Sequence, residues 1–167
     1  MKLNKKAFTL IELIIVLAIM AILTTGVVVG VRIIISANIT DAAKRIDSAI
    51  SKLRLENMTK TPKSYLYLYN IDDVLYMKTS ESDSATVENG AIDAASGIRL
   101  ANNVKLSYID LSNIQNNLEN GKEIKISFSR SSGAFLSEIK SLILSSYGNG
   151  KTTTIRCVIE TGKHVIE

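Results

Sequence analysis

The feature that most constrains this chain is an uncharged run of 19 residues, Leu13–Val31, composed mostly of Ile, Leu, Val and Ala. As an α-helix rising about 1.5 Å per residue, the run would extend about 29 Å, the thickness of a membrane's hydrocarbon layer. A helix also pairs its own backbone polar groups, as a membrane requires. Lys2, Lys5 and Lys6 precede the run and predict a cytoplasmic N-terminus with the rest of the chain outside.

Glu12 is the only charged residue between Phe8 and Val31. An ionised carboxylate deep in lipid costs about 2.5–3.5 kcal/mol, so its presence needs an explanation. One interpretation is a side chain that reaches the membrane interface. The other is a carboxylate that awaits a cation, and the apolar run offers none before Arg32, about 30 Å along a helix. The second interpretation places the partner on another chain or on a newly made N-terminus.

Residues 5–14 read Lys-Lys-Ala-Phe-Thr-Leu-Ile-Glu-Leu-Ile. They closely resemble the leader and first helical turns of type IV prepilins and pseudopilins. The resemblance implies that a prepilin peptidase removes residues 1–7 by cutting between Ala7 and Phe8, and that the new amine of Phe8 is methylated. The family usually has glycine before the cut, whereas this chain has the similarly small Ala7.

By the same resemblance, Glu12 and Phe8 are the assembly residues. Cleavage makes an ammonium four residues before Glu12. Within one chain the two groups could touch, whereas in a staggered bundle Glu12 of an incoming subunit can instead meet the Phe8 amine of its predecessor. Such a pair is stronger in low dielectric than in water, while an unpaired partner stays costly. The pairing would set the axial register and draw the subunit out of the membrane into a filament.

Gly26 and Gly30 are the expected sites of helix flexibility. Many family members carry a proline near position 29, where this chain has Val29. Each glycine weakens a helix by about 1 kcal/mol relative to alanine. Their Gly-x-x-x-Gly spacing would also let a neighbouring helix approach closely. Two tolerated small residues in a membrane helix is the other interpretation.

Beyond the apolar run, the sequence keeps a helical period and becomes amphipathic. No helix breaker appears before Pro62, so we expect one helix over Phe8–Lys60. Residues 8–35 would form its transmembrane or filament-core half, and residues 36–61 an amphipathic half packed on a sheet. A coiled coil is the rival use of the stripe. The stripe contains Ile35, Ile39, Ala42, Ile46, Ala49, Ile50 and Leu53.

Residues 62–167 predict an antiparallel meander, because short alternating strands are separated by turn residues. Tyr65–Tyr69 and Val74–Met77 read as two strands around a turn. Ser80–Gly97 has four acids and no Lys or Arg and predicts a solvated loop, and Asn113–Gly121 predicts another. The predicted fold class is α+β, a long N-terminal helix packed on a C-terminal antiparallel β-sheet domain. Further strands are expected at 98–100, 104–109, 122–129, 136–147, 151–160 and 163–167.

Composition excludes several kinds of site. The 167 residues include one Cys and one His, so neither an internal disulfide nor a zinc site can form. Cys157 and His164 are the only thiol–imidazole candidates. On a hairpin turning at Thr161–Gly162 they could lie diagonally on one face, but no third polar residue clearly orients the histidine. We therefore expect no catalytic residue, no metal and no cofactor.

The leading hypothesis is a type IV pilus subunit of the minor class, and the order of strands in the sheet domain also resembles minor pilins and some pseudopilins. The expected partners are the prepilin peptidase, other pilin subunits, an inner-membrane assembly platform and, before assembly, membrane lipid. The alternatives are a pseudopilin of a type II secretion or DNA-uptake machine, and a single-pass anchored binding protein that keeps its N-terminus. Nine basic and six acidic residues in 98–167 permit DNA binding but do not show it.

Overall fold

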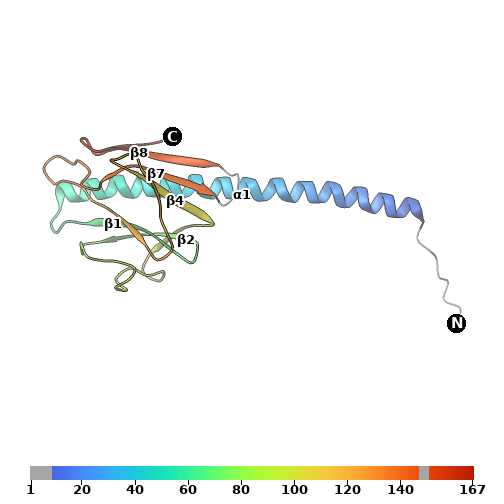
Figure 1. Cartoon of the computed structure of the whole chain (residues 1–167), viewed down its shortest axis with the longest axis horizontal. Coiled ribbons are helices and arrows are strands. Elements are labelled where there is room, and N and C mark those ends of the chain that lie inside the picture. The colour runs from blue at the N-terminus through green and yellow to red at the C-terminus, as the bar shows by residue number, and fades with distance from the viewer. Residues whose placement is uncertain (1–8, 147–150) are drawn as a thin grey trace. The chain divides into compact units, whose positions relative to one another are not determined.

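The computed structural model describes residues 9–146 and 151–167, and for residues 25–29, 31, 32 and 35 it describes the backbone alone (Figure 1). The chain divides into two units, residues 1–35 and 36–167. In the second unit a helix packs on two antiparallel sheets. The predicted α+β fold class is therefore confirmed.

Helix α1 (Leu10–Thr59) begins and ends close to the bounds predicted from the sequence. Phe8, where we expected the helix to begin, lies outside the described residues. In the last turn, the Lys60 amide donates to the Glu56 carbonyl at 2.7 Å. Pro62 follows two residues later, lacks a backbone donor and disfavours helix in the residue before it.

The C-terminal part of α1 buries one apolar stripe against the sheets. Six of its side chains are at most 2% exposed and recur at three- and four-residue steps. Each large apolar side chain buried in this way contributes about 1.5–3 kcal/mol. The stripe therefore packs on the chain's own sheets, as we predicted in preference to a coiled coil. The six residues are Ile39, Ala42, Ala43, Ile46, Ile50 and Leu53.

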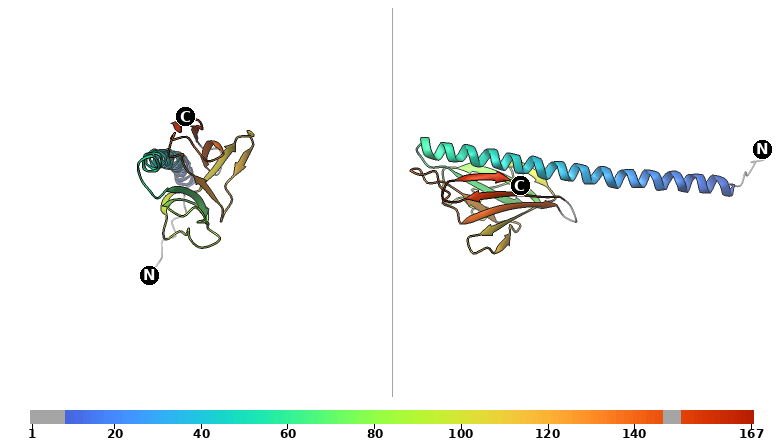
Figure 2. Two further views of the ribbon diagram at one scale, coloured as in Figure 1. Left: turned by 90° about the vertical axis from the view of Figure 1, so that its left-hand side faces the viewer. Right: turned by 90° about the horizontal axis from the view of Figure 1, so that it is seen from above.

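The first sheet has four strands in the order β3-β2-β1-β6, and both of its faces are covered. Leu66 and Leu68 point to one face and Tyr67 and Tyr69 to the other, and all four are at most 1% exposed. Figures 1 and 2 show α1 on one side of these strands and the loop that connects β2 to β3 on the other. The strands are β1 (Tyr65–Ile71), β2 (Val74–Ser80), β3 (Ile98–Asn102) and β6 (Glu123–Ile126).

The second sheet has five strands in the order β5-β4-β7-β8-β9. Its inner face is lined by Leu106, Leu142, Leu144 and Ile155, none more than 2% exposed. The strands are β4 (Val104–Asp110), β5 (Gln115–Asn117), β7 (Ile139–Ser146), β8 (Thr152–Val158) and β9 (Lys163–Ile166).

Two expectations about the sheets were wrong. The strands do not form one meander, because β6 returns to pair with β1 and β7 returns to pair with β4. Asn113–Gly121, expected as a loop, contains the short strand β5. This strand is polar because it lies at a sheet edge, where Asn117 accepts a hydrogen bond from the Ser107 hydroxyl at 2.8 Å. Alternating apolar residues therefore could not reveal it.

The sheet domain over residues 62–167 is called the head below. Arg54 connects α1 to two turns of this head. Its Nε donates to the Gly133 carbonyl at 3.1 Å, and its Nη2 donates to the Thr161 carbonyl at 2.8 Å. Gly162 has a φ of 66°, a backbone conformation that side chains disfavour. A Cβ added there would also overlap the Gly133 carbonyl oxygen. The close approach of the two turns thus requires glycine at position 162.

Gly162→Ala is expected to lower the free energy of unfolding by about 3 kcal/mol, because it adds a clash to the cost of a positive φ. Thermal unfolding of the full-length chain in detergent, followed by circular dichroism, measures the change. Gly121→Ala is the matched control, because Gly121 has a φ of 76° but open space where its Cβ would lie. The control should lose about 1 kcal/mol. Equal losses in both variants would contradict the clash.

Candidate functional site

Helix α1 begins at a capping box formed by Thr9 and Glu12. Glu12 Oε2 accepts hydrogen bonds from the amide and the hydroxyl of Thr9, each at 3.1 Å. The Glu12 amide donates in return to Thr9 Oγ1 at 3.3 Å. The Leu13 amide donates to the Thr9 carbonyl at 3.3 Å and closes the first turn. Thr9 is therefore the N-cap, in the Thr-x-x-Glu spacing typical of this motif.

The capping box gives Glu12 partners within its own chain, whereas the expected partner was a cation on another chain or at a new N-terminus. The Thr-x-x-Glu spacing was the signal that could have revealed them. The helix dipole also favours a negative charge at this end. Ala7 and Phe8 lie outside the described residues, so the cleavage site and the pairing of Glu12 with Phe8 stay predictions.

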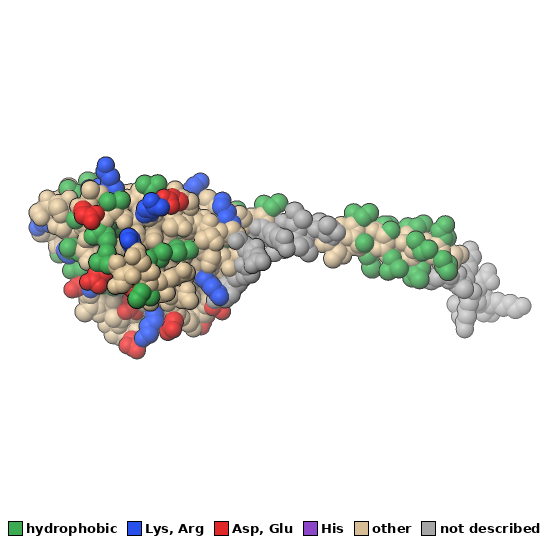
Figure 3. Space-filling view, turned by 45° about the horizontal axis from the view of Figure 1, so that its top comes forward, with side chains coloured by type: hydrophobic (Ala, Val, Ile, Leu, Met, Phe, Trp, Pro, Cys, Tyr) green, Lys and Arg blue, Asp and Glu red, His purple; other side chains and the backbone are tan. Residues whose placement is uncertain are grey.

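The first turns of α1 expose an apolar surface on all sides. Every described side chain from Thr9 to Thr24 is exposed. Figure 3 shows the apolar side chains of this segment in green. The large apolar side chains are between 44% and 76% exposed: Leu10, Ile11, Leu13, Ile14, Ile15, Val16, Leu17, Ile19, Met20, Ile22 and Leu23. A surface of this kind is stable only when lipid or other protein covers it.

Across the residues with described side chains, the structure contains no helix with the length and apolar character needed to cross a membrane. The membrane segment expected over residues 8–35 stays a prediction. Helix α1 runs without interruption through Gly26 and Gly30, the expected flexible sites. Among the described residues, a Cβ added at Gly30 would meet nothing within 4 Å. That these glycines loosen the helix stays a prediction.

Cys157 and His164 lie directly opposite each other on the β8–β9 hairpin, rather than diagonally as expected. His164 also has polar partners on α1 that the sequence did not reveal. Its Nε2 lies 3.0 Å from Ser51 Oγ, 3.2 Å from the Asp47 carbonyl oxygen and 3.3 Å from Asp47 Oδ1. Asp47 and Ser51 stand one helical turn apart and together hold the C-terminal hairpin on α1.

The Cys157–His164 pair lacks the geometry of a nucleophile and its base. Both polar neighbours of His164 contact its Nε2 atom. Its Nδ1 atom is buried and has no hydrogen-bond partner among the described residues. A catalytic histidine uses one nitrogen for orientation and the other for the nucleophile. Burial, with a smaller contribution from Asp47, raises the pKa of Cys157 to about 12. The thiol is therefore protonated at neutral pH. The contacts of His164 with Asp47 and Ser51 hold the C-terminal hairpin against α1.

No group of three His, Cys, Asp or Glu side chains within the described part of the chain could hold a metal ion. The fold defines a class of protein in which a single long helix exposes an apolar N-terminal segment and packs its C-terminal part on antiparallel sheets.

Residues 2–28 match the family model described as the prokaryotic N-terminal methylation motif. The match includes the basic leader, the predicted cleavage site and Glu12. It supports the recognition of this chain as a type IV pilin-like or pseudopilin-like prepilin, a class of structural subunits. The motif implies processing by a prepilin peptidase and assembly with other pilin subunits. No curated protein and no solved structure matches the chain significantly.

Cys157 is expected to resist thiol reagents in the native chain. At pH 8, a rise in its pKa from 9.0 to about 12 lowers the thiolate fraction about a thousandfold. The rate of iodoacetamide modification, compared between the native chain in detergent and the chain in guanidinium, measures the protection. No other cysteine contributes to the signal. A native rate within about tenfold of the denatured rate would contradict the burial of this thiol.

Proposed function

We propose that this chain is a type IV pilus subunit of the minor class. In this proposal a prepilin peptidase cleaves between Ala7 and Phe8, Phe8 is methylated, and the mature chain enters an extracellular filament. The observation that carries the proposal is the methylation motif over residues 2–28, which continues into an apolar helix surface that the chain leaves uncovered.

The uncovered surface explains why, in this proposal, the chain needs membrane lipid before assembly and neighbouring helices after it. Each large apolar side chain between Leu10 and Leu23 would cost about 1.5–3 kcal/mol if it stayed in water. In the proposal, lipid of the cytoplasmic membrane covers these side chains first, with the N-terminus inside and the head outside. An assembly platform in the membrane then transfers the subunit into the filament, where neighbouring helices cover the same surface.

The capping box supports the proposed role of Glu12. The amine that cleavage creates on Phe8 is three covalent bonds from the Thr9 nitrogen, within about 4 Å of it. Glu12 Oε2 lies 3.1 Å from that same nitrogen. The helix start therefore holds the carboxylate of Glu12 close to the new ammonium. In a staggered bundle, Glu12 of an incoming subunit would pair with the Phe8 amine of its predecessor and set the axial register.

A pseudopilin of a type II secretion or DNA-uptake machine would use the same N-terminal chemistry. The two functions differ in where the assembled chain is found. A pilus subunit is recovered in filaments sheared from the cell surface, whereas a pseudopilin stays in the envelope.

The mature chain recovered from sheared filaments is expected to begin at N-methylated Phe8 and to lack residues 1–7. Mass spectrometry of the intact chain and of its N-terminal peptide measures both changes. Ala7→Gly restores the residue that the family usually has before the cut, so it should be processed at least as completely. Native protein that retains Met1 would rule out the proposed processing.

Substitutions of Glu12 separate its charge from its capping role. Glu12→Ala removes both and is expected to leave membrane insertion intact while blocking incorporation into filaments. Glu12→Gln is the sharper variant, because glutamine can complete a capping box but carries no charge. Immunoblotting of sheared filaments and of membranes measures the two pools. Normal incorporation of Glu12→Gln would show that pairing with the Phe8 amine does not drive assembly.

A further inference from the structure

A trench lies between α1 and the edge of β2. It consists of two cavities of about 510 and 270 Å³, which share Glu56 and Thr79 among their lining residues. The larger cavity has an apolar floor that includes Leu53 of α1, Met77 of β2 and Ile98 of β3. Because both cavities follow one strand, the trench is elongated and suits an extended segment better than a compact ligand.

The trench exists because β3 ends before β2 does. β3 pairs with β2 only over Val74–Met77, so Lys78–Ser80 has no strand beside it on this side within the described chain. Residues of a strand direct their backbone groups alternately to their two neighbours. The two-residue turn that follows Ile71 pairs Val74 with Ile71. Thr79, an odd number of positions further on, therefore directs its amide and carbonyl to the free edge.

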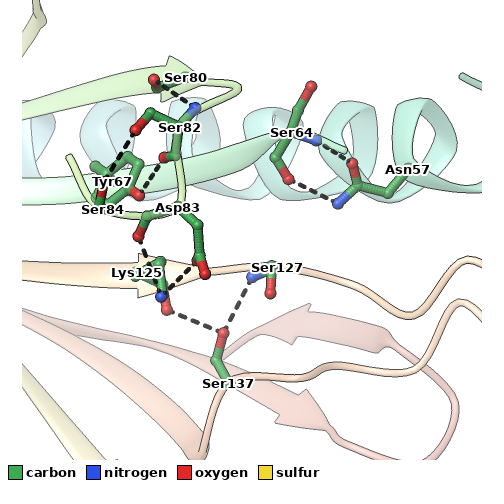
Figure 4. Close-up of polar contacts among 10 residues, drawn as sticks. All are labelled: Asn57, Ser64, Tyr67, Ser80, Ser82, Asp83, Ser84, Lys125, Ser127 and Ser137. Carbon is green, nitrogen blue, oxygen red and sulfur yellow. Dashed lines mark hydrogen bonds and ion pairs between the residues drawn. The ribbon is translucent and has the colours of Figure 1, made fainter. Parts of the chain in front are cut away.

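The loop that connects β2 to β3 leaves this edge free because it turns to the other face of the sheet. Figure 4 shows that the Ser82 amide donates to the Ser80 hydroxyl at 3.2 Å and that the Tyr67 hydroxyl donates to the Ser82 carbonyl at 2.6 Å. Lys78 pairs with Tyr67 across the strands, so its side chain shares that face and bonds the loop there. The charge of Lys78 therefore does not belong to the trench.

The α1 wall of the trench is fixed near its C-terminal end. Asn57 Nδ2 donates to the Ser64 carbonyl at 2.8 Å, and Asn57 Oδ1 accepts from the Ser64 amide at 2.7 Å (Figure 4). Asn57 is buried. These two bonds join the end of the helix to the chain just before β1, the strand that pairs with β2. The trench is therefore held open by contacts within the chain.

Two lysines of α1 give the trench positive charge. Lys44 and Lys52 line the larger cavity, are exposed and have no ion-pair partner among the described residues. Arg45 and Glu56 also line it, but each pairs with a residue one turn away on α1, at 2.9 and 3.4 Å. Glu81 lines the smaller cavity. An acidic side chain of a partner is therefore attracted to the end of the trench that carries the two lysines.

We propose that the trench binds an extended segment of a different pilin subunit, which adds a short strand to the free edge of β2. Its apolar side chains would cover Leu53, Met77 and Ile98, and an acidic side chain would face Lys44 or Lys52. Segments of this kind are recognised by main-chain hydrogen bonds to the edge and by pockets for alternate side chains. The inference rests on the proposed function, because the neighbours of a minor subunit are subunits of other kinds.

Photo-cross-linking inside filaments identifies the occupant. Benzoylphenylalanine is placed at Ser48, an exposed residue at the rim of the trench, in cells that assemble filaments. Mass spectrometry of irradiated and sheared filaments is expected to find an adduct with a segment of a different pilin subunit that contains Asp or Glu. The same probe at Lys122 is the matched control, because Lys122 is exposed and precedes β6 at the opposite edge of the sheet.

The two ways in which this experiment can fail are distinguishable. An adduct only with a second copy of this chain, or no adduct above the Lys122 control, would overturn the inference. Absence of the chain from sheared filaments would instead contradict the proposed function.

Thr79→Pro tests whether the partner adds a strand. Proline removes the amide that points to the free edge, a position where a sheet tolerates proline. Recovery of the folded variant in sheared filaments is expected to fall severalfold, whereas Thr79→Ala, which keeps the amide, should be recovered normally. Circular dichroism checks that both variants are folded. Equal recovery of the two folded variants would show that the strand edge is not used.

Charge reversal is a separate test that does not depend on the folding of Thr79→Pro. The double variant Lys44→Glu with Lys52→Glu is expected to lower both recovery in filaments and the yield of the Ser48 adduct severalfold. Lys122→Glu reverses a charge away from the trench and should change neither quantity. Normal recovery of the double variant with an undiminished adduct would contradict an acidic partner and, with it, the inference.

Discussion

Burial of the α1 stripe against the two sheets is the interaction on which the head depends. Side chains from Ile39 to Leu53 fill the space between helix and sheets, and polar contacts fix the helix in place around them. Arg54 reaches two turns, and Asp47 and Ser51 reach His164 on the last strand. Because the chain has one cysteine, no internal disulfide secures the C-terminal hairpin. The contacts of Arg54, Asp47 and Ser51, together with the pairing of β8 with β9, hold this hairpin instead.

The same helix changes character along its length. In residues 36–59 most of its large apolar side chains lie on the face that the sheets cover, with Leu55 and Met58 exposed, whereas between Leu10 and Leu23 they occupy every face. A helix that is apolar on every face cannot be covered by packing one face on a sheet. It requires lipid or protein on all sides. The methylation motif covers residues 2–28. The predicted cleavage site and the uncovered apolar surface therefore lie in the same part of the chain. The capping box at Thr9 and Glu12 places the single acid of the segment at its very start.

Features set by local periodicity could be predicted from the sequence. The bounds of α1, its buried stripe and most strands follow from spacing, breakers and turn residues. The capping box is equally local, and its Thr-x-x-Glu spacing is visible in the sequence. The partners of His164 could not be predicted, because Asp47 lies 117 residues earlier in the chain. The edge strand β5 carries no apolar signal.

Cys157 is the one cysteine of the chain, and its thiol is buried. Its side chain is 5% exposed, and burial raises the pKa of its thiol to about 12. A second cysteine, introduced on the exposed surface of the head, would be the one thiol that a maleimide dye reaches without unfolding the chain. The natural chain is thus suited to fluorescent labelling at a single chosen site, which would let its location in the cell be followed under a microscope.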